Sequence, residues 1–95
     1  MTVPQMAVDA IFHRSESASM SRLSANEGVM VAFEAGVYVR LNESAMLIWD
    51  LVDGLRSCAL ITEAYADYFK ISGDMALKDA RACLEQFLEL QVVYV

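Results

Sequence analysis

The chain has 95 residues, of which 57% are hydrophobic, and its 7 Lys or Arg against 13 Asp or Glu leave a formal net charge of −6. This length allows one small domain, and the apolar fraction excludes a disordered or low-complexity chain. Proteins that bind nucleic acid or anionic membranes normally carry the opposite charge, so we expect neither partner. Two cysteines are too few for a disulfide framework, and the N-terminus lacks the pattern of a signal peptide, which favours a cytoplasmic location.

The first 17 residues are weakly patterned. Val8, Ala10 and Phe12 alternate with their neighbours, as a short strand or an ordered tail would. A serine-rich stretch follows and interrupts any helix, and it leaves a weak signal for a first strand over Ala18–Leu23. We therefore predict a weakly ordered N-terminal tail over residues 1–17 and a single domain over residues 18–95.

A β-hairpin is the clearest feature of the first half. Val29–Phe33 is rich in β-branched and aromatic residues, and a short connection ending in Gly36 leads to a second apolar run. That second run places Val37, Val39 and Leu41 on one face and Tyr38 and Arg40 on the other.

Helical periodicity begins directly after the hairpin. We predict a first helix capped by Asn42 or Ser44 and ended by Gly54, and a second helix capped by Ser57. Ser72-Gly73-Asp74 is the next break and cap, a third helix runs from about Met75 to Leu90, and an apolar tail follows that packs on the body. The predicted buried stripes are Ala45, Ile48, Trp49 and Val52; Ile61, Ala64, Tyr65, Tyr68 and Phe69; and Ala80, Cys83, Leu84, Phe87 and Leu88.

This order of elements predicts an α+β domain in which a small sheet precedes three helices. The arrangement is similar to the winged helix-turn-helix architecture with its sheet at the front. Similarity of fold does not by itself imply DNA binding. A winged-helix DNA-binding regulator nevertheless stays open as an alternative, against which the negative charge argues.

The sequence offers little catalytic chemistry. The single histidine, His13, lies in the weakly patterned segment, and the glycine motifs that bind phosphates are missing. Cys83 belongs to a predicted buried stripe, whereas Cys58 falls at a helix N-terminus, where the thiol pKa is lowered. We predict no catalytic residue, no metal site and no cofactor, and we keep a small enzyme that uses Cys58 as an alternative.

A chain without a catalytic centre is more consistent with binding. If the strand over Val37–Leu41 lies at the edge of its sheet, its unpaired backbone groups can accept an extended peptide as an added strand. The third helix would then supply a side wall. The same edge could instead be covered by the N-terminal tail or by a second copy of the chain, so homodimerisation stays open.

Residues 36–54, G-V-Y-V-R-L-N-E-S-A-M-L-I-W-D-L-V-D-G, resemble the signature of PqqD-like proteins. These are the stand-alone form of the element that recognises precursor peptides of ribosomally synthesised and post-translationally modified peptides (RiPPs). The resemblance covers residues 20–95. The matching positions are Leu41, Asn42, Ile48, Trp49, Asp53, Gly54, Ile61, Asp79 and Ala80.

This resemblance implies a three-stranded antiparallel sheet followed by three helices, and a non-catalytic function. The third strand would bind the leader segment of a precursor peptide by antiparallel strand addition, against the third helix. The bound precursor would be presented to a maturation enzyme, such as a leader peptidase or a radical SAM enzyme. Carried over by position, the implied peptide-binding residues are Val37, Tyr38, Val39, Arg40 and Leu41 on the strand and Lys78, Arg81, Ala82 and Glu85 on the helix.

The chain departs from the family pattern in ways that bear on structure and subtype. Gln91 stands where the family usually has Gly, which predicts a longer third helix, and Ala80 replaces the commoner Val. The pair Ile48-Trp49 resembles proteins of lasso-peptide clusters more than the pyrroloquinoline quinone (PQQ) pathway member. A chaperone of PQQ biosynthesis therefore stays as an alternative to a lasso-type or related pathway.

Overall fold

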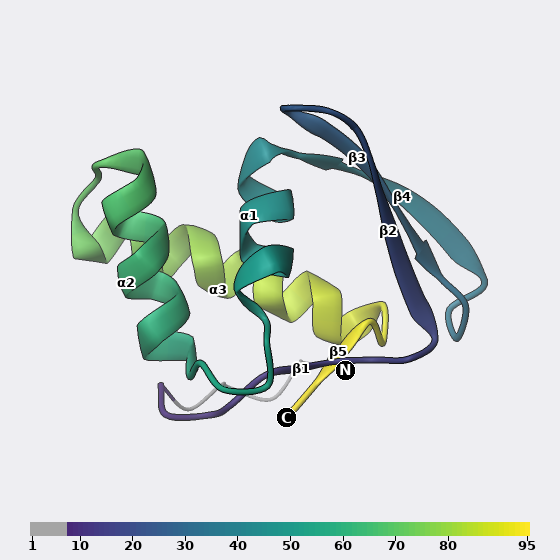
Figure 1. Cartoon of the computed structure of the whole chain (residues 1–95). Helices are drawn as coiled ribbons and strands as arrows, with labels where there is room; N and C mark the ends of the chain where they lie inside the picture. Colours follow the sequence, from purple (N-terminus) through teal and green to yellow (C-terminus); the bar gives the residue numbers. More distant parts are fainter. Residues whose placement is uncertain (1–7) are drawn as a thin grey trace.

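The computed structural model describes residues 8–95 and places a twisted sheet on one side of a bundle of helices (Figure 1). In chain order the elements are β1 (His13–Arg14), β2 (Ala18–Ser24), β3 (Glu27–Ala32), β4 (Val37–Asn42), α1 (Glu43–Leu51), α2 (Cys58–Phe69), α3 (Gly73–Glu89) and β5 (Val93–Tyr94). This order confirms the predicted α+β class, with three antiparallel strands, β2–β3–β4, followed by three helices.

The β3–β4 hairpin is regular. Its register pairs Met30 with Val39 and Val31 with Tyr38 without interruption, and Gly36 turns the chain with a φ of 72°. Gly28 lets α1 approach the inner face of the sheet closely, because a Cβ there would lie only 2.7 Å from the Met46 Sδ. Helix α1 therefore packs directly on the sheet, and α2 and α3 complete the bundle (Figure 1).

The three predicted helix caps are confirmed. Asn42, Ser57 and Ser72 accept hydrogen bonds through their side-chain oxygens from backbone N–H groups three residues ahead, at 2.9–3.2 Å. The prediction that Gly54 ends the first helix is wrong: α1 ends at Leu51, and Gly54 lies beyond the extended cap residue Val52. Gly54 takes a φ of 78° in the loop, where its N–H donates to the Phe12 carbonyl.

The core lies between the inner face of the sheet and the helices. Trp49 and Phe87 meet edge to face with ring centroids 6.0 Å apart, which joins α1 to α3. In α2 the predicted stripe is partly wrong, because Tyr68 is 59% exposed. The buried residues of α2 lie in its first two turns instead and are Cys58, Ile61, Thr62 and Tyr65.

The described part of the N-terminal segment contributes more to the fold than its weak pattern predicts. Phe12 is fully buried, and β1 pairs antiparallel with β5, so this segment lies beside the C-terminal strand (Figure 1). The carbonyls of Val8 and Ala10 accept the first backbone N–H groups of α2, from Ala59 and Cys58. Residues 1–7 of the predicted tail lie outside the described residues.

The C-terminal end of α3 differs from the expected extension. The helix ends at Glu89, Leu90 caps it, and Gln91 takes a left-handed φ of 60°. The backbone therefore adopts the conformation that favours the usual Gly, although the residue is Gln. This turn directs Val92 and Val93 into the core, which confirms the predicted packing of the tail.

Candidate functional site

Strand β4 forms one edge of the three-stranded sheet. Within residues 8–95 it pairs only with β3, so one side of its backbone has no partner strand. Leu41 is buried and Val39 half-buried on the face towards α3, whereas Tyr38 is 75% exposed and Arg40 is exposed on the outer face. The predicted alternation and the predicted edge are thus both present.

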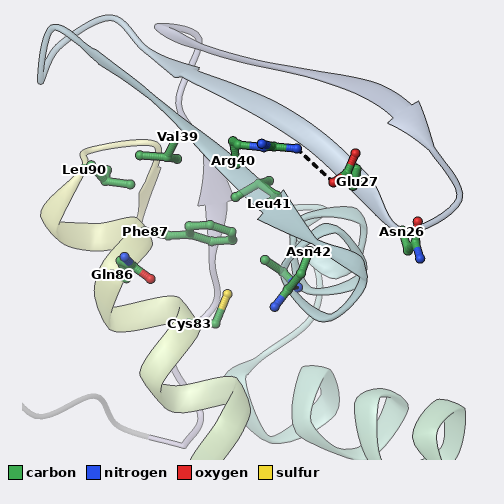
Figure 2. Close-up of a pocket in the computed structure, with 11 residues that line it drawn as sticks. Asn26, Glu27, Val39, Arg40, Leu41, Asn42, Cys83, Gln86, Phe87 and Leu90 are labelled. Carbon is green, nitrogen blue, oxygen red and sulfur yellow. Dashed lines mark hydrogen bonds and ion pairs between the residues drawn. The ribbon is translucent and has the colours of Figure 1, made fainter.

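A groove of about 360 Å³ separates β4 from α3 (Figure 2). Its strand side is formed by Val39 and Leu41, and the Phe87 ring lies beneath Leu41. Figure 2 shows Asn42 at one end of the groove, and Val39 with Leu90 at the other. The complete lining is Asn26, Glu27, Val39, Arg40, Leu41, Asn42, Ala45, Cys83, Gln86, Phe87 and Leu90.

The groove is nearly neutral. Its charged lining residues are Glu27 and Arg40, whose side chains form an ion pair of 2.8 Å on the solvent side. Both partners are more than half exposed, so this pair contributes little to stability and can rearrange. Burial raises the pKa of the Cys83 thiol to about 12, which keeps it protonated as a small, weakly polar part of the wall. The groove therefore suits uncharged side chains.

The helix residues predicted to form the wall do not border this groove. Lys78, Arg81, Ala82 and Glu85 line a separate shallow depression on α3, together with Asp74 and Leu77. Consecutive helix residues differ by 100° in direction, so Ala82 and its neighbour Cys83 face different surroundings. The structure instead brings Cys83, Gln86, Phe87 and Leu90 to β4.

A sequence signal for this wall existed. Cys83 and Phe87 belong to the predicted buried stripe, and Gln86 follows Cys83 by three positions, at the boundary between the apolar and polar faces. The sequence pattern places the whole stripe in the core, whereas in the structure Cys83 and Phe87 also border the groove.

The alternative that used Cys58 as a reactive thiol is not supported. The residue is 1% exposed, and its backbone N–H donates to the Ala10 carbonyl. Burial raises the pKa of the Cys58 thiol, so the predicted lowering by the helix N-terminus is wrong. His13 stacks on Tyr94 with ring centroids 5.1 Å apart.

Two further findings concern residues 8–95 only. No group of three or more His, Cys, Asp or Glu side chains in this range could hold a metal ion. None of the helices in this range is long and apolar enough to cross a membrane.

Comparison with known proteins finds a matching family and a solved structure with a similar fold. A family model described as "Coenzyme PQQ synthesis protein D (PqqD)" matches residues 27–93, which include β3, β4 and all three helices. A solved structure described as "TbiB1 in Complex with the TbiA(beta) Leader Peptide" has a TM-score of 0.74 and 18% sequence identity. The match covers 87% of this chain and 98% of that chain, and at this identity it shows a shared fold. Among curated proteins, none matches the chain.

Proposed function

We propose, from the premise that this chain belongs to the PqqD family, that it binds the leader segment of a ribosomally synthesised precursor peptide and catalyses no reaction itself. The observation that carries the proposal is the open edge of β4 beside the groove on α3. The leader-peptide complex of a protein with the same fold supports it. The protein would act as a peptide chaperone.

Strand addition to β4 is the binding mode that the groove favours. A six-residue strand offers a backbone edge about 20 Å long, whose N–H and C=O groups bind any sequence. Alternate side chains of the added leader would point into the groove, between Val39 and Leu41 on one side and Leu90 on the other. Because the groove is nearly neutral, these inward positions should be uncharged.

The proposed contact set keeps the strand and extends the helix. Val37, Tyr38, Val39, Arg40 and Leu41 would bind the leader along β4, and Cys83, Gln86 and Leu90 would contact its inward side chains. The residues predicted as the helix wall, Lys78, Arg81, Ala82 and Glu85, would instead contact a part of the leader that continues past the groove over the depression on α3.

The bound precursor would pass to a maturation enzyme, such as a leader peptidase or a radical SAM enzyme. We favour a lasso-type or related pathway because of the resemblance carried by Ile48-Trp49, and a chaperone of PQQ biosynthesis is the alternative. Trp49 is 5% exposed and packs on Phe87, so it would not touch the leader. It favours the lasso-type pathway only through its resemblance to the sequences of that group.

Capture of the natural ligand tests the proposal directly. The tagged full chain is purified from lysate of the native host, and bound species are identified by mass spectrometry. A short precursor peptide, with or without its enzyme, is the expected result and would name the pathway. Nucleic acid alone would support the winged-helix regulator instead, and a large protein without any peptide would contradict leader binding.

A proline substitution then tests the binding mode. Tyr38→Pro removes a backbone N–H from the open side of β4, because backbone groups alternate along the strand and that of Val39 faces Met30 on β3. The variant should weaken binding of the captured peptide at least about tenfold, the equivalent of one or two lost hydrogen bonds. Leu23→Pro is the matched control, because Leu23 is exposed at the irregular end of the opposite edge strand, where Pro is tolerated. Unchanged affinity in a folded Tyr38→Pro variant would contradict strand addition.

A further inference from the structure

The two edges of the sheet differ in their protection against pairing with another chain. On β2 the register shifts between Arg22 and Ser24, and the Arg22 guanidinium crosses to Asp50 on α1. On β4 the pairing with β3 is regular from end to end, without a bulge or a proline, and Val37 and Tyr38 are exposed. Bulges and charged side chains blunt edges, whereas a regular edge with exposed apolar residues accepts another strand.

We propose that β4 pairs antiparallel with β4 of a second copy, in a two-fold register centred on Val39, and that a leader peptide must displace this copy to bind. The displacement by a leader peptide rests on the proposed function, because the leader and the second copy would use the same backbone edge of β4. The dimer would therefore regulate access to the leader site.

The sequence of β4 selects this register. Residues directly opposite each other share a face of the sheet, so inward residues must meet inward ones. Centring on Val39 places Tyr38 opposite Arg40 of the partner subunit and Val37 opposite Leu41 of the partner subunit. The first pair sets a cation beside an aromatic ring on the outer face, and the second joins two aliphatic side chains on the inner face.

Neighbouring registers are worse. Centring on Arg40 would place two guanidinium groups directly opposite each other, and like charges in that position are destabilising. Centring on Tyr38 would set Arg40 opposite Gly36 of the partner subunit, which offers no side chain. The register centred on Val39 is the one in which the charged and the apolar residues both find complementary partners.

The predicted dimer is weak and depends on salt. One strand from each copy is a small contact of the transient class, and each copy carries a net charge of −6, so the copies repel at low ionic strength. Added salt screens this repulsion. Self-association of the 10.5 kDa chain should therefore increase with both protein and salt concentration. Because the dimer is weak, a leader peptide could readily dissociate it.

Sedimentation of the full chain measures self-association, and a cysteine pair measures the register. Val39→Cys places two thiols opposite each other, at the Cα separation of about 4.5–5.5 Å that a disulfide needs. Val37→Cys is the matched control on the same face, because its two copies would be four residues out of register, about 13 Å apart. Oxidised glutathione should cross-link the first variant at least about tenfold faster than the second, because a disulfide cannot span the second gap without backbone movement.

A peptide of residues 36–42 from the chain itself probes displacement. It should lower the cross-linking yield of Val39→Cys and the dimer fraction of the unmodified chain, and a scrambled peptide should do neither. A monomer at every protein and salt concentration, or equal cross-linking of both variants, would overturn the dimer and leave leader binding intact. A dimer with this register in a chain that captures no leader would support the dimer and contradict leader binding.

Discussion

Replacement of Phe12 with Ala asks how much of the stability resides in the N-terminal segment. The side chain is fully buried and is among the largest in the core. Truncating a buried Phe to Ala costs about 3–5 kcal/mol, from lost apolar burial and the cavity left behind. A 95-residue domain has a total free energy of unfolding of roughly 5–14 kcal/mol. The substitution should therefore remove a large fraction of it.

Urea unfolding followed by tryptophan fluorescence provides the measurement. Trp49 is the single tryptophan and is 5% exposed, so its emission reports the loss of the core. Ile11→Ala is the matched control: Ile11 is 37% exposed, and its loss should cost about 1 kcal/mol or less. If Phe12→Ala is no more destabilising than Ile11→Ala, the segment is not part of the core.

Three further outcomes are expected. Gln91→Gly should raise the free energy of unfolding by up to about 1 kcal/mol, because Gln91 holds a φ of 60° that Gly adopts without strain; a lower midpoint in urea would contradict this. Asn42→Ala should lower the free energy of unfolding by about 0.5–2 kcal/mol through loss of the α1 cap, whereas Glu43→Ala, which removes no cap hydrogen bond, should have a smaller effect. The free energy of unfolding should also fall as pH rises above 9.0, the ordinary pKa of a thiol. Burial raises the pKa of Cys83 to about 12, so the unfolded chain loses this proton at a lower pH than the folded chain. The fall should be shallower in Cys83→Ala.

Local sequence patterns were enough to predict most of the secondary structure. The hairpin was evident from alternation around Gly36, and the caps at Asn42, Ser57 and Ser72 were evident from residue type and position. These features depend on contacts within a few residues, where side-chain chemistry and backbone preference act together. The family was also evident from the ordered residues of the hairpin and first helix, because that stretch combines strand, cap and helix in one motif.

Long-range packing governed the rest. Phe12 lies in a segment whose weak alternation does not predict burial, and it is buried in a segment held in place where β1 pairs with β5 at the other end of the chain. Cys58 stands at a helix N-terminus, yet it is 1% exposed and its backbone N–H donates to the Ala10 carbonyl, so desolvation raises the pKa of its thiol despite the helix dipole.

The candidate site shows the same division. Residues on β4 could be assigned from alternation alone, because a strand has only two faces and one of them must be buried. The wall on α3 could not, because a helix presents a continuous range of directions and its rotation against β4 depends on how Phe87 packs beneath Leu41 and beside Trp49. Rotation by one residue exchanges Ala82 for Cys83, so the packing of the core selects which side chains a bound peptide would meet.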